Sequence, residues 1–485
     1  MMQTIVLESC IILQPFMSFR VLLVFFWVIA HSAAAQSDSV SQSPHSKFSS
    51  ATIIIENIHI TGNRTTKEDI ILREMNVKPG DEIPVGSLSD LLVINRKRIY
   101  NSALFTNVTV TADTIDTQKI NLLVTVNERW YIIPQITFQL ADRNFNVWWT
   151  EQNADISRSI IGLTTVHKNF RGNRELLGVS TLVGYRKEFS VSYLKPFIDK
   201  EQKKGIGFEA GISSNKELFY TTDSNKLLFI RNTDRHIISR FWVAALLTYR
   251  PAYTTVHQFK LSFKHSKVDD TVLQLNPDYY RNGSNALDYL ELNYRVDVNN
   301  VDNWAYPLTG SKIVGNLFTN IGFKGIKFFS YVTLEAGKYN RLADKWYSSF
   351  ILRGKLSVPG NQPYIARQAL GTKYEYVRGY ELFVIDGYQY GIVRSNLKYE
   401  LLNINIRNIP FKYLPALPLR IYPKLFADAG YVATPQTGNS YLNNRLIYSV
   451  GAGIDIFTAY DFKVRFEYAI NHLGQKGLFL HFNAE

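Results

Sequence analysis

The sequence predicts a mainly β protein, in which one small α/β domain with the order β-α-α-β-β precedes a transmembrane antiparallel β-barrel of about 16 strands. Three observations support this fold class. From Trp130 to Glu485, apolar and polar residues alternate in runs of about ten residues separated by polar turns. After Ala35 no apolar stretch is long enough for a membrane-spanning helix, so only a closed barrel could cross a membrane. Aromatic residues form 14% of the chain, and Tyr and Trp favour membrane interfaces.

The N-terminus reads as a secretory signal over residues 1–35. Arg20 precedes an apolar run from Val21 to Ala30, and small residues before Gln36 offer a cleavage site. Residues 17–35 alone make a compact signal, so we interpret Met17, rather than Met1, as the more natural start. The Ser-rich residues 36–51 are predicted to be a disordered linker.

The single cysteine and the net charge argue against several classes of function. Cys10 lies inside the predicted signal, so disulfide, zinc-thiolate and cysteine-nucleophile schemes are excluded for the mature chain. The net charge is +13. In an exported, aromatic-rich chain, this charge favours lipid head groups or a charged pore interior as its partner and argues against nucleic acid.

Residues 52–129 form the predicted α/β domain. The expected elements are a strand over 52–60, a helix that opens at the Thr65-x-x-Glu68 capping box and runs to about 75, a second helix after position 87, and strands over 105–112 and 119–127. Thr65 and Glu68 have the spacing of a capping box for the first helix, and Ser87 is expected to cap the second.

The barrel is predicted from residue 130 to residue 485. Alternation alone would also fit a soluble sandwich, but the signal, the lack of cysteine, the aromatic excess and the strand length favour a barrel. The roughly 355 residues fit about 16 strands at about 22 residues for each strand and its loop. In one run, 461–470, the apolar face holds Phe462, Val464, Phe466, Tyr468 and Ile470, and the other face holds Asp461, Lys463, Arg465 and Glu467.

Strand parity places two acids inside the barrel. The inward faces of two later strands are predicted to be Arg394, Asn396, Lys398 and Glu400 on one, and Lys424, Phe426, Asp428 and Gly430 on the other. Arg378 lies in the polar-aromatic loop 372–390 that precedes both strands. If this loop folds into the lumen, Arg378 could pair with Glu400, Asp428 or both, because guanidinium binds two carboxylate oxygens at once.

These motifs resemble a known superfamily. The segments ITGN, LFTNVTV and INLLVTVNE at positions 60–63, 104–110 and 120–128 resemble a POTRA domain, although a small structural cap remains an alternative. Val377-Arg378-Gly379-Tyr380, together with Phe426, Asp428 and Gly430, resembles the paired VRG[FY] and F-x-D-x-G motifs of the BamA/TamA-like POTRA-plus-barrel superfamily. The acidic strand position matches at Tyr399-Glu400-Leu401, and 302–310 resembles a further mid-barrel motif.

The resemblance implies a loop-to-lumen lock and a sorting signal. In that superfamily the loop arginine contacts interior acids and holds the loop in the lumen, which implies this role for Arg378 and Gly379 with Glu400 and Asp428. A structural lock alone, a lock that also handles clients, and a solvated loop are the three alternatives. Gly477, Leu478, Leu480 and Phe482 resemble a C-terminal sorting signal of outer-membrane barrels, although three residues follow the usual final aromatic.

No enzyme, cofactor or metal is expected. The mature chain has no H-E-x-x-H, no phosphate-binding G-x-x-x-x-G-K-[ST] and no G-x-S-x-G elbow. The nine His residues are scattered, and charged residues normally line the lumen of such barrels.

The resemblance implies a bacterial outer-membrane assembly factor with its POTRA domain in the periplasm. Its partners would be unfolded outer-membrane proteins, outer-membrane lipid, and periplasmic chaperones or accessory lipoproteins. Two alternatives stay open: a two-partner-secretion transporter that exports a dedicated protein, and a structural accessory barrel of a larger complex. Such transporters usually carry two POTRA domains and a plug helix. The sequence suggests neither a second POTRA domain nor a plug helix.

Overall fold

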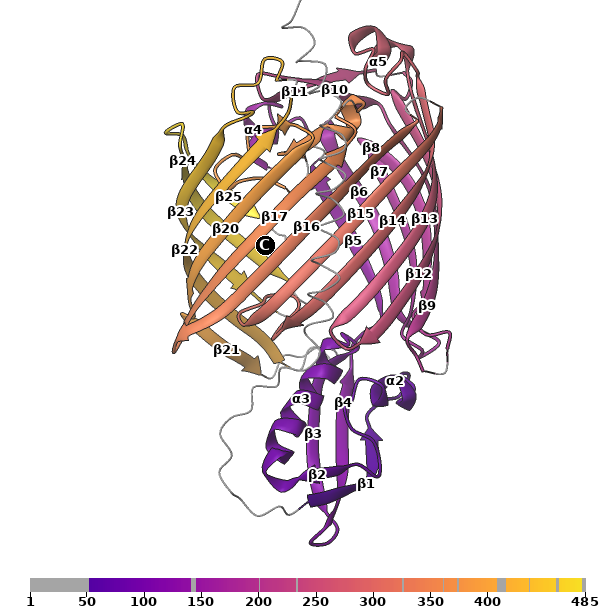
Figure 1. Cartoon of the computed structure of the whole chain (residues 1–485), viewed down its shortest axis with the longest axis vertical. Helices are drawn as coiled ribbons and strands as arrows, with labels where there is room; N and C mark the ends of the chain where they lie inside the picture. The colour runs from indigo at the N-terminus through magenta and orange to yellow at the C-terminus, as the bar shows by residue number, and fades with distance from the viewer. Residues whose placement is uncertain are drawn as a thin grey trace, which may run out of the picture.

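The computed structural model describes residues 52–140, 145–199, 201–232, 234–324, 327–360, 362–372, 375–407, 416–435, 437–458 and 462–481. A small α/β domain lies beneath one mouth of a barrel of tilted strands (Figure 1). The signal at 1–35, the linker at 36–51 and Phe482 all lie outside the described residues, so these parts of the prediction stay predictions.

The small domain has the predicted element order with one extra short strand. Its elements are β1 (Thr52–Thr61), α2 (Glu68–Leu72), β2 (Glu82–Pro84), η1 (Val85–Ser87), α3 (Leu88–Asn101), β3 (Phe105–Thr114) and β4 (Lys119–Glu128). The sheet order is β2-β1-β4-β3, and β1 is parallel to β4. The core between sheet and helices includes Ile55, Ile71, Ile99, Phe105 and Leu122, which are all buried.

Both predicted helix caps are wrong in detail. α2 begins after Lys67 without a side-chain cap and ends at Leu72. The backbone N–H groups of Thr65 and Thr66, which precede it, donate to the Glu128 carboxylate. Ser87 does precede α3, but its hydroxyl donates to the Pro84 carbonyl at 2.8 Å. The backbone N–H groups before α2 and the Ser87 hydroxyl therefore bond to tertiary and turn partners instead of taking part in helix caps.

The barrel closes with 16 antiparallel strands, which confirms the predicted fold class. β20 and β21 count as one strand interrupted at Glu400 and Leu401, since both pair with β22. The strands are β5 (Ile132–Leu140), β6 (Ser159–Phe170), β7 (Glu175–Gly184), β8 (Arg186–Lys195), β9 (Lys204–Asn215), β12 (Ile238–Ala252), β13 (Thr255–Val268), β14 (Ala286–Val301), β15 (Gly310–Lys324), β16 (Phe328–Ala343), β17 (Trp346–Val358), β20 (Gln389–Tyr399), β21 (Leu402–Arg407), β22 (Ala416–Ala433), β23 (Leu446–Phe457), β24 (Lys463–Asn471) and β25 (Lys476–His481).

Short elements lie between the barrel strands. They are the hairpin β10 (Glu217–Asp223) and β11 (Lys226–Arg231), the pair β18 (Gln368–Leu370) and β19 (Ile385–Asp386), and the helices α4 (Phe145–Thr150), η2 (Ile156–Arg158), α5 (Asp270–Leu275) and η3 (Tyr364–Ala366). The β10–β11 hairpin and α5 lie at the barrel end far from the small domain (Figure 1).

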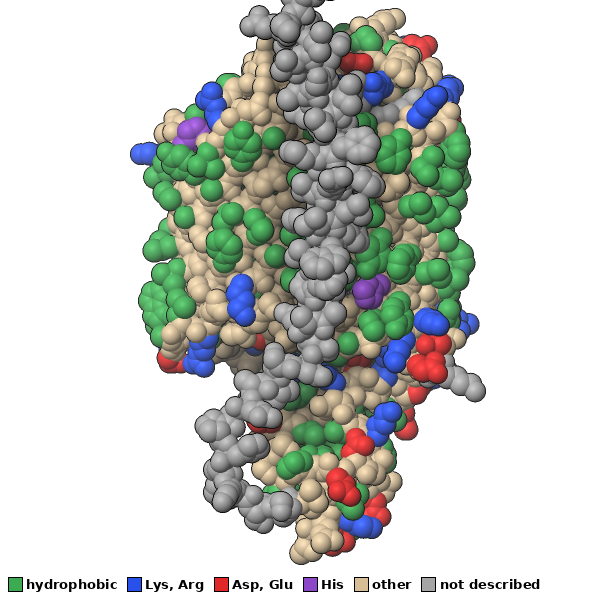
Figure 2. Space-filling view, in the orientation of Figure 1, with side chains coloured by type: hydrophobic (Ala, Val, Ile, Leu, Met, Phe, Trp, Pro, Cys, Tyr) green, Lys and Arg blue, Asp and Glu red, His purple; other side chains and the backbone are tan. Residues whose placement is uncertain are grey.

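The barrel wall is apolar outside and polar inside. Apolar side chains gather over the face of the barrel that Figure 2 shows. Leu425, Phe466 and Tyr468 are among the exposed large apolar residues of its strands. The inward faces carry buried charges such as Lys424 and Glu467, as the alternation predicts. No helix in the described part of the chain is long and apolar enough to cross a membrane.

The small domain is tied to the barrel through one buried carboxylate. Glu74 follows α2 and accepts hydrogen bonds from Arg174 at 3.0 Å and from Arg250 at 2.8 Å, both of which lie beside turns of the barrel. Asn169 on the same side donates to the Thr66 hydroxyl at 2.9 Å. Gly172 is required in this contact, because its φ is +75° and a Cβ there would lie 2.1 Å from the Thr65 carbonyl oxygen.

Candidate functional site

The loop between β17 and β20 folds into the barrel lumen. Val377, Arg378 and Tyr380 are all buried there, and Arg378 is only 1% exposed. Gly379 has a φ of +85°, which favours glycine, and a Cβ at this position would lie 3.2 Å from the Ala469 Cβ. The solvated-loop alternative therefore does not describe Arg378.

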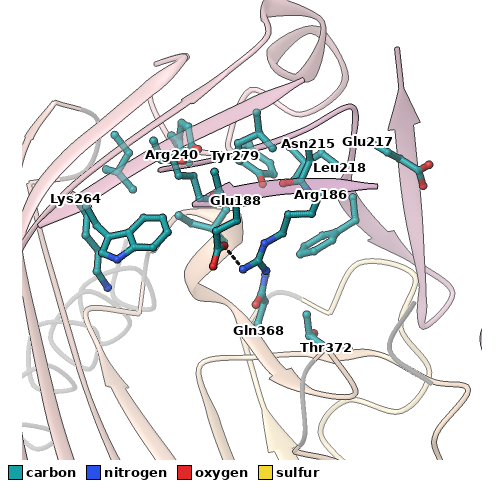
Figure 3. Close-up of a pocket in the computed structure, with 18 of the residues that line it drawn as sticks. Arg186, Glu188, Asn215, Glu217, Leu218, Arg240, Lys264, Tyr279, Gln368 and Thr372 are labelled. Atoms are coloured by element: carbon teal, nitrogen blue, oxygen red, sulfur yellow. Dashed lines mark hydrogen bonds and ion pairs between the residues drawn. The ribbon is translucent and has the colours of Figure 1, made fainter. Parts of the chain in front are cut away.

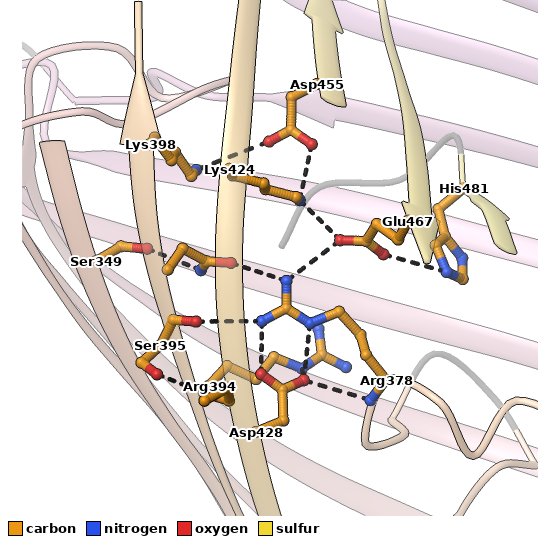
Figure 4. Close-up of polar contacts among 12 residues, drawn as sticks. Ser349, Arg378, Arg394, Ser395, Lys398, Lys424, Asp428, Asp455, Glu467 and His481 are labelled. Atoms are coloured by element: carbon orange, nitrogen blue, oxygen red, sulfur yellow. Dashed lines mark hydrogen bonds and ion pairs between the residues drawn. The ribbon is translucent and has the colours of Figure 1, made fainter. Parts of the chain in front are cut away.

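Arg378 binds the barrel wall through its whole guanidinium group. Its Nε and Nη2 donate to the two oxygens of Asp428 at 2.7 and 2.5 Å, as a bidentate pair (Figure 4). Its Nη1 donates to the Asn396 side-chain oxygen at 2.8 Å and to Glu467 at 3.2 Å. Both carboxylates are buried, so these charges are shielded from water by the barrel itself.

The inward face of β22 explains the F-x-D-x-G spacing. The Phe426 ring lies 3.9 Å from the Arg378 guanidinium carbon, which is a cation–π contact, and Asp428 supplies the carboxylate. Gly430 leaves room for Val377, because a Cβ there would lie 2.6 Å from a methyl group of Val377. Residues two apart on one strand share a face, so these three positions of β22 receive Val377 and Arg378 together.

Tyr380 completes the loop motif. Its hydroxyl bonds to the His472 imidazole and donates to the Tyr448 carbonyl at 3.3 Å. The Asn471 side chain donates to the Gly379 carbonyl at 2.8 Å. The loop is thereby held by β22 on one side and by the end of β24 on the other.

Glu400 does not meet Arg378, which corrects that part of the predicted lock. Its carboxylate accepts a hydrogen bond from the Tyr422 hydroxyl at 3.2 Å instead. Asp428 pairs with Arg394 across the strands, and Glu400 follows Arg394 by six residues, or about 20 Å along the strand. Parity gives the face that a residue occupies, but not its height in the barrel.

Sequence reasoning did not single out Glu467, which takes the place expected for Glu400. Glu467 accepts from Lys424 at 2.7 Å, and Lys424 also donates to Asp455 at 2.7 Å. The Tyr306 hydroxyl donates to Asp455 at 2.8 Å from the β14–β15 turn, near the small domain. A continuous polar network thus runs from the loop through the lumen to the opposite end of the barrel.

The same loop also contacts the last strand. The Tyr376 ring stacks on His481 of β25 at 5.3 Å, and His481 Nε2 lies 3.5 Å from Glu381 of the loop and 3.3 Å from Glu467. In β25, Leu478 points outward, Leu480 is half-buried, and Gly477 lies against the Phe479 ring. The predicted sorting residues 477, 478 and 480 therefore lie in one strand, and their sorting role stays a prediction.

The contacts around Arg378 bind the loop to the barrel wall and hold it in position in the lumen. Within the described residues no group of His, Cys, Asp or Glu is placed to hold a metal ion. The carboxylates of the lock are bonded to cations, so each acid has a structural partner.

Comparisons with known proteins agree with this architecture. The POTRA family, described as surface antigen variable number repeat, matches residues 53–129. No curated protein matches the sequence. Among solved structures, BamA from Haemophilus ducreyi lacking POTRA domains 1–3 is similar at 13% identity and a TM-score of 0.51, over 89% of this chain and 83% of that chain. CdiB from Escherichia coli is similar at 9% identity and a TM-score of 0.52, over 96% of this chain and 97% of that chain.

The family match identifies residues 53–129 as a POTRA domain, and the fold of the chain is similar to the folds of BamA and CdiB. The POTRA domain is the small α/β domain, and the barrel has the fold of BamA and CdiB.

Proposed function

We propose that this protein is an assembly factor of the bacterial outer membrane, with its POTRA domain in the periplasm. It would bind unfolded outer-membrane proteins through the POTRA domain and assist their insertion through the barrel. Periplasmic chaperones or accessory lipoproteins would deliver the clients. This role requires no cofactor.

The observation that carries the proposal is the outer edge of β3. Within the described residues β3 pairs only with β4, so the other edge of this ten-residue strand is available for an added strand. Unfolded barrel proteins are made of segments that form strands, and strand addition binds them through the backbone without requiring one sequence. The domain is fixed beneath the barrel mouth by Glu74, which keeps this edge near the membrane.

The lumen lock supports insertion over export. Export through the barrel would require the loop that carries Arg378 to move out of the way. That movement would break a buried bidentate ion pair and the network behind it, at a cost of several kcal/mol. An assembly factor can work at the barrel wall while the loop stays in place.

Depletion in the native host tests the proposal. We expect a general loss of outer-membrane barrel proteins, measured by quantitative proteomics of the outer membrane. Loss of a single secreted protein, with a normal outer membrane, would instead establish the transporter alternative. No change in either fraction would leave the structural accessory role.

Photo-crosslinking tests where the client binds. A photoreactive residue at the exposed Thr111 of β3 should capture newly exported barrel proteins, and the same residue at the exposed Lys97 of α3 should capture far less. Equal capture at both positions would contradict binding at the β3 edge.

A further inference from the structure

A cavity of about 690 Å³ lies inside the barrel, on the wall opposite the lock. Its wall is the inner face of β8, β9, β12, β13 and β14. Residues of the β10–β11 hairpin, together with Tyr279 and Tyr280, also line it. The hairpin lies at the barrel end far from the POTRA domain (Figure 1). This volume is typical of sites that bind small organic molecules, which often occur in the mouths of β-barrels.

The cavity has an apolar side and a charged side. The apolar side belongs to a hydrophobic cluster and includes Leu218, Phe219, Tyr279, Tyr280, Leu287, Tyr289 and Ile365. The charged side carries Arg186, Glu188, Glu209, Arg240, Lys260 and Lys264. A ligand that fills this cavity must therefore be amphipathic.

The lining carboxylates are already paired. The pairs are Glu188 with Arg186, Glu209 with Lys260, Glu217 with Arg158, and Glu151 with Lys226. Of the remaining lining cations, Lys264 binds Glu291 at 2.8 Å and His265 binds Asp288.

Arg240 differs from the other lining cations. Among the residues that the structure describes, its guanidinium makes no hydrogen bond and no ion pair, and in Figure 3 the dashed line joins Arg186 to Glu188 while none reaches Arg240. Arg240 lies within electrostatic reach of Tyr279 and Tyr280, at the border between the apolar and charged sides. A half-buried guanidinium without a carboxylate is an anchor for an anion.

We infer that this cavity binds a small amphipathic organic anion. Its carboxylate, or a similar anionic head, accepts hydrogen bonds from Arg240, and its apolar body packs against Tyr279, Tyr280 and Leu218. Ile365, Gln368 and Thr372 of the loop that carries Arg378 also line the cavity, but the cavity shares no residue with the lock itself or with the POTRA edge, so the inference does not depend on the proposed assembly role.

A matched pair of probes tests this inference on the full chain in lipid nanodiscs. Naphthalene-2-carboxylate carries the charge, and naphthalene-2-carboxamide has nearly the same shape without it. Equilibrium dialysis, corrected with empty nanodiscs, should show that the wild-type protein binds the carboxylate at least about tenfold tighter, since one charged hydrogen-bond pair has this effect.

Variants then assign the preference to Arg240. Arg240→Gln should abolish the preference for the carboxylate, and Arg240→Lys should keep part of it. Arg445→Gln removes the same charge from an exposed loop outside the cavity and should change nothing. Heat-modified mobility on semi-native gels would show that each variant is folded.

Three results would overturn the inference. They are equal binding of the two probes, no binding of either probe to the wild-type protein, and a preference that persists in folded Arg240→Gln.

Discussion

Arg378 shows how one residue can depend on a whole barrel. Alone, a loop arginine next to a glycine would be solvated, because surface ion pairs contribute little. In the barrel its guanidinium is bonded to Asp428, Asn396 and Glu467 and stacked on a ring, all away from water. Deleting one partner of such a group leaves a buried charge without compensation, which costs much more than losing a surface pair.

We expect Arg378→Ala to destabilise the folded barrel by about 3–5 kcal/mol, because Asp428 and Glu467 would remain buried without this cation. The measurement is the temperature at which the folded form disappears on semi-native gels. Arg378→Lys should also lower it, since an ammonium cannot form the bidentate pair. Arg445→Ala, at an exposed position, is the control, and an unchanged transition in Arg378→Ala would refute the lock.

Gly430 gives a second test with a built-in rescue. Gly430→Ala should destabilise the barrel by about 1–3 kcal/mol, because the new methyl group would lie 2.6 Å from the side chain of Val377. Adding Val377→Ala removes the clashing methyl and should restore most of the loss relative to Val377→Ala alone. Gly391→Ala, with no atom within 4 Å of its Cβ, should be nearly neutral. Additive losses in the double variant would mean that Val377 does not pack on Gly430.

At the scale of elements, the junction between α2 and the barrel turns sets the position of the POTRA domain. Burial by itself raises the pKa of Glu74, but Arg174 and Arg250 lower it by more, so the pKa of this carboxyl lies below its usual value. Burial also lowers the pKa of the neighbouring Arg73 to about 10, so Arg73 stays charged at neutral pH. The Glu74 carboxylate is thus ionised and paired at neutral pH.

Docking of the POTRA domain should therefore weaken in acid. A depressed carboxyl pKa contributes stability that is present above its unfolded value, about 4.3, and is lost as the pH falls through the lower folded value. Glu74→Gln should loosen the domain at pH 7, measured as a broader distance distribution between spin labels on the POTRA domain and the barrel.

The difference between Glu74→Gln and wild type should shrink progressively as the pH falls below about 4, because the wild-type carboxyl becomes protonated as the pH passes through its lowered pKa. Asp116→Gln, in the exposed β3–β4 turn, is the matched control. A difference that stays constant from pH 7 to pH 3 would show that the charge of Glu74 does not hold the domain.

At the scale of the whole molecule, the barrel is turned inside out relative to a soluble protein. Its outer surface is apolar, and its interior carries a charged network from Arg378 to Asp455 and Tyr306. This arrangement suits a hydrocarbon solvent, in which closed strands satisfy every backbone group.

A charge on the outer face should cost stability according to its depth. Leu425→Arg, near the middle of β22 and 60% exposed, should cost about 2–4 kcal/mol in lipid. Leu446→Arg, at the end of β23 and 59% exposed, should cost about 0–1 kcal/mol. Unfolding in urea from lipid vesicles measures both values. Equal costs would contradict a membrane centred on the middle of β22.

The sequence by itself determined the fold class, the strand number and the inward faces. Alternation is a property of each strand alone, so Asp428 and Lys424 could be placed inside without a structure. The POTRA order β-α-α-β-β was likewise readable, since each element has its own period and turn signals.

Only the tertiary structure decided which inward residues meet. Asp428 rather than Glu400 binds Arg378, and Glu467 from a strand distant in sequence joins them, because strand stagger sets the height of each residue in the lumen. The unpaired Arg240, the cavity beside it and the Glu74 junction likewise depend on chain segments brought together from far apart. The alternation period of each strand is encoded by its own sequence. The register between strands and the height of each residue in the lumen are set by the closure of the whole barrel.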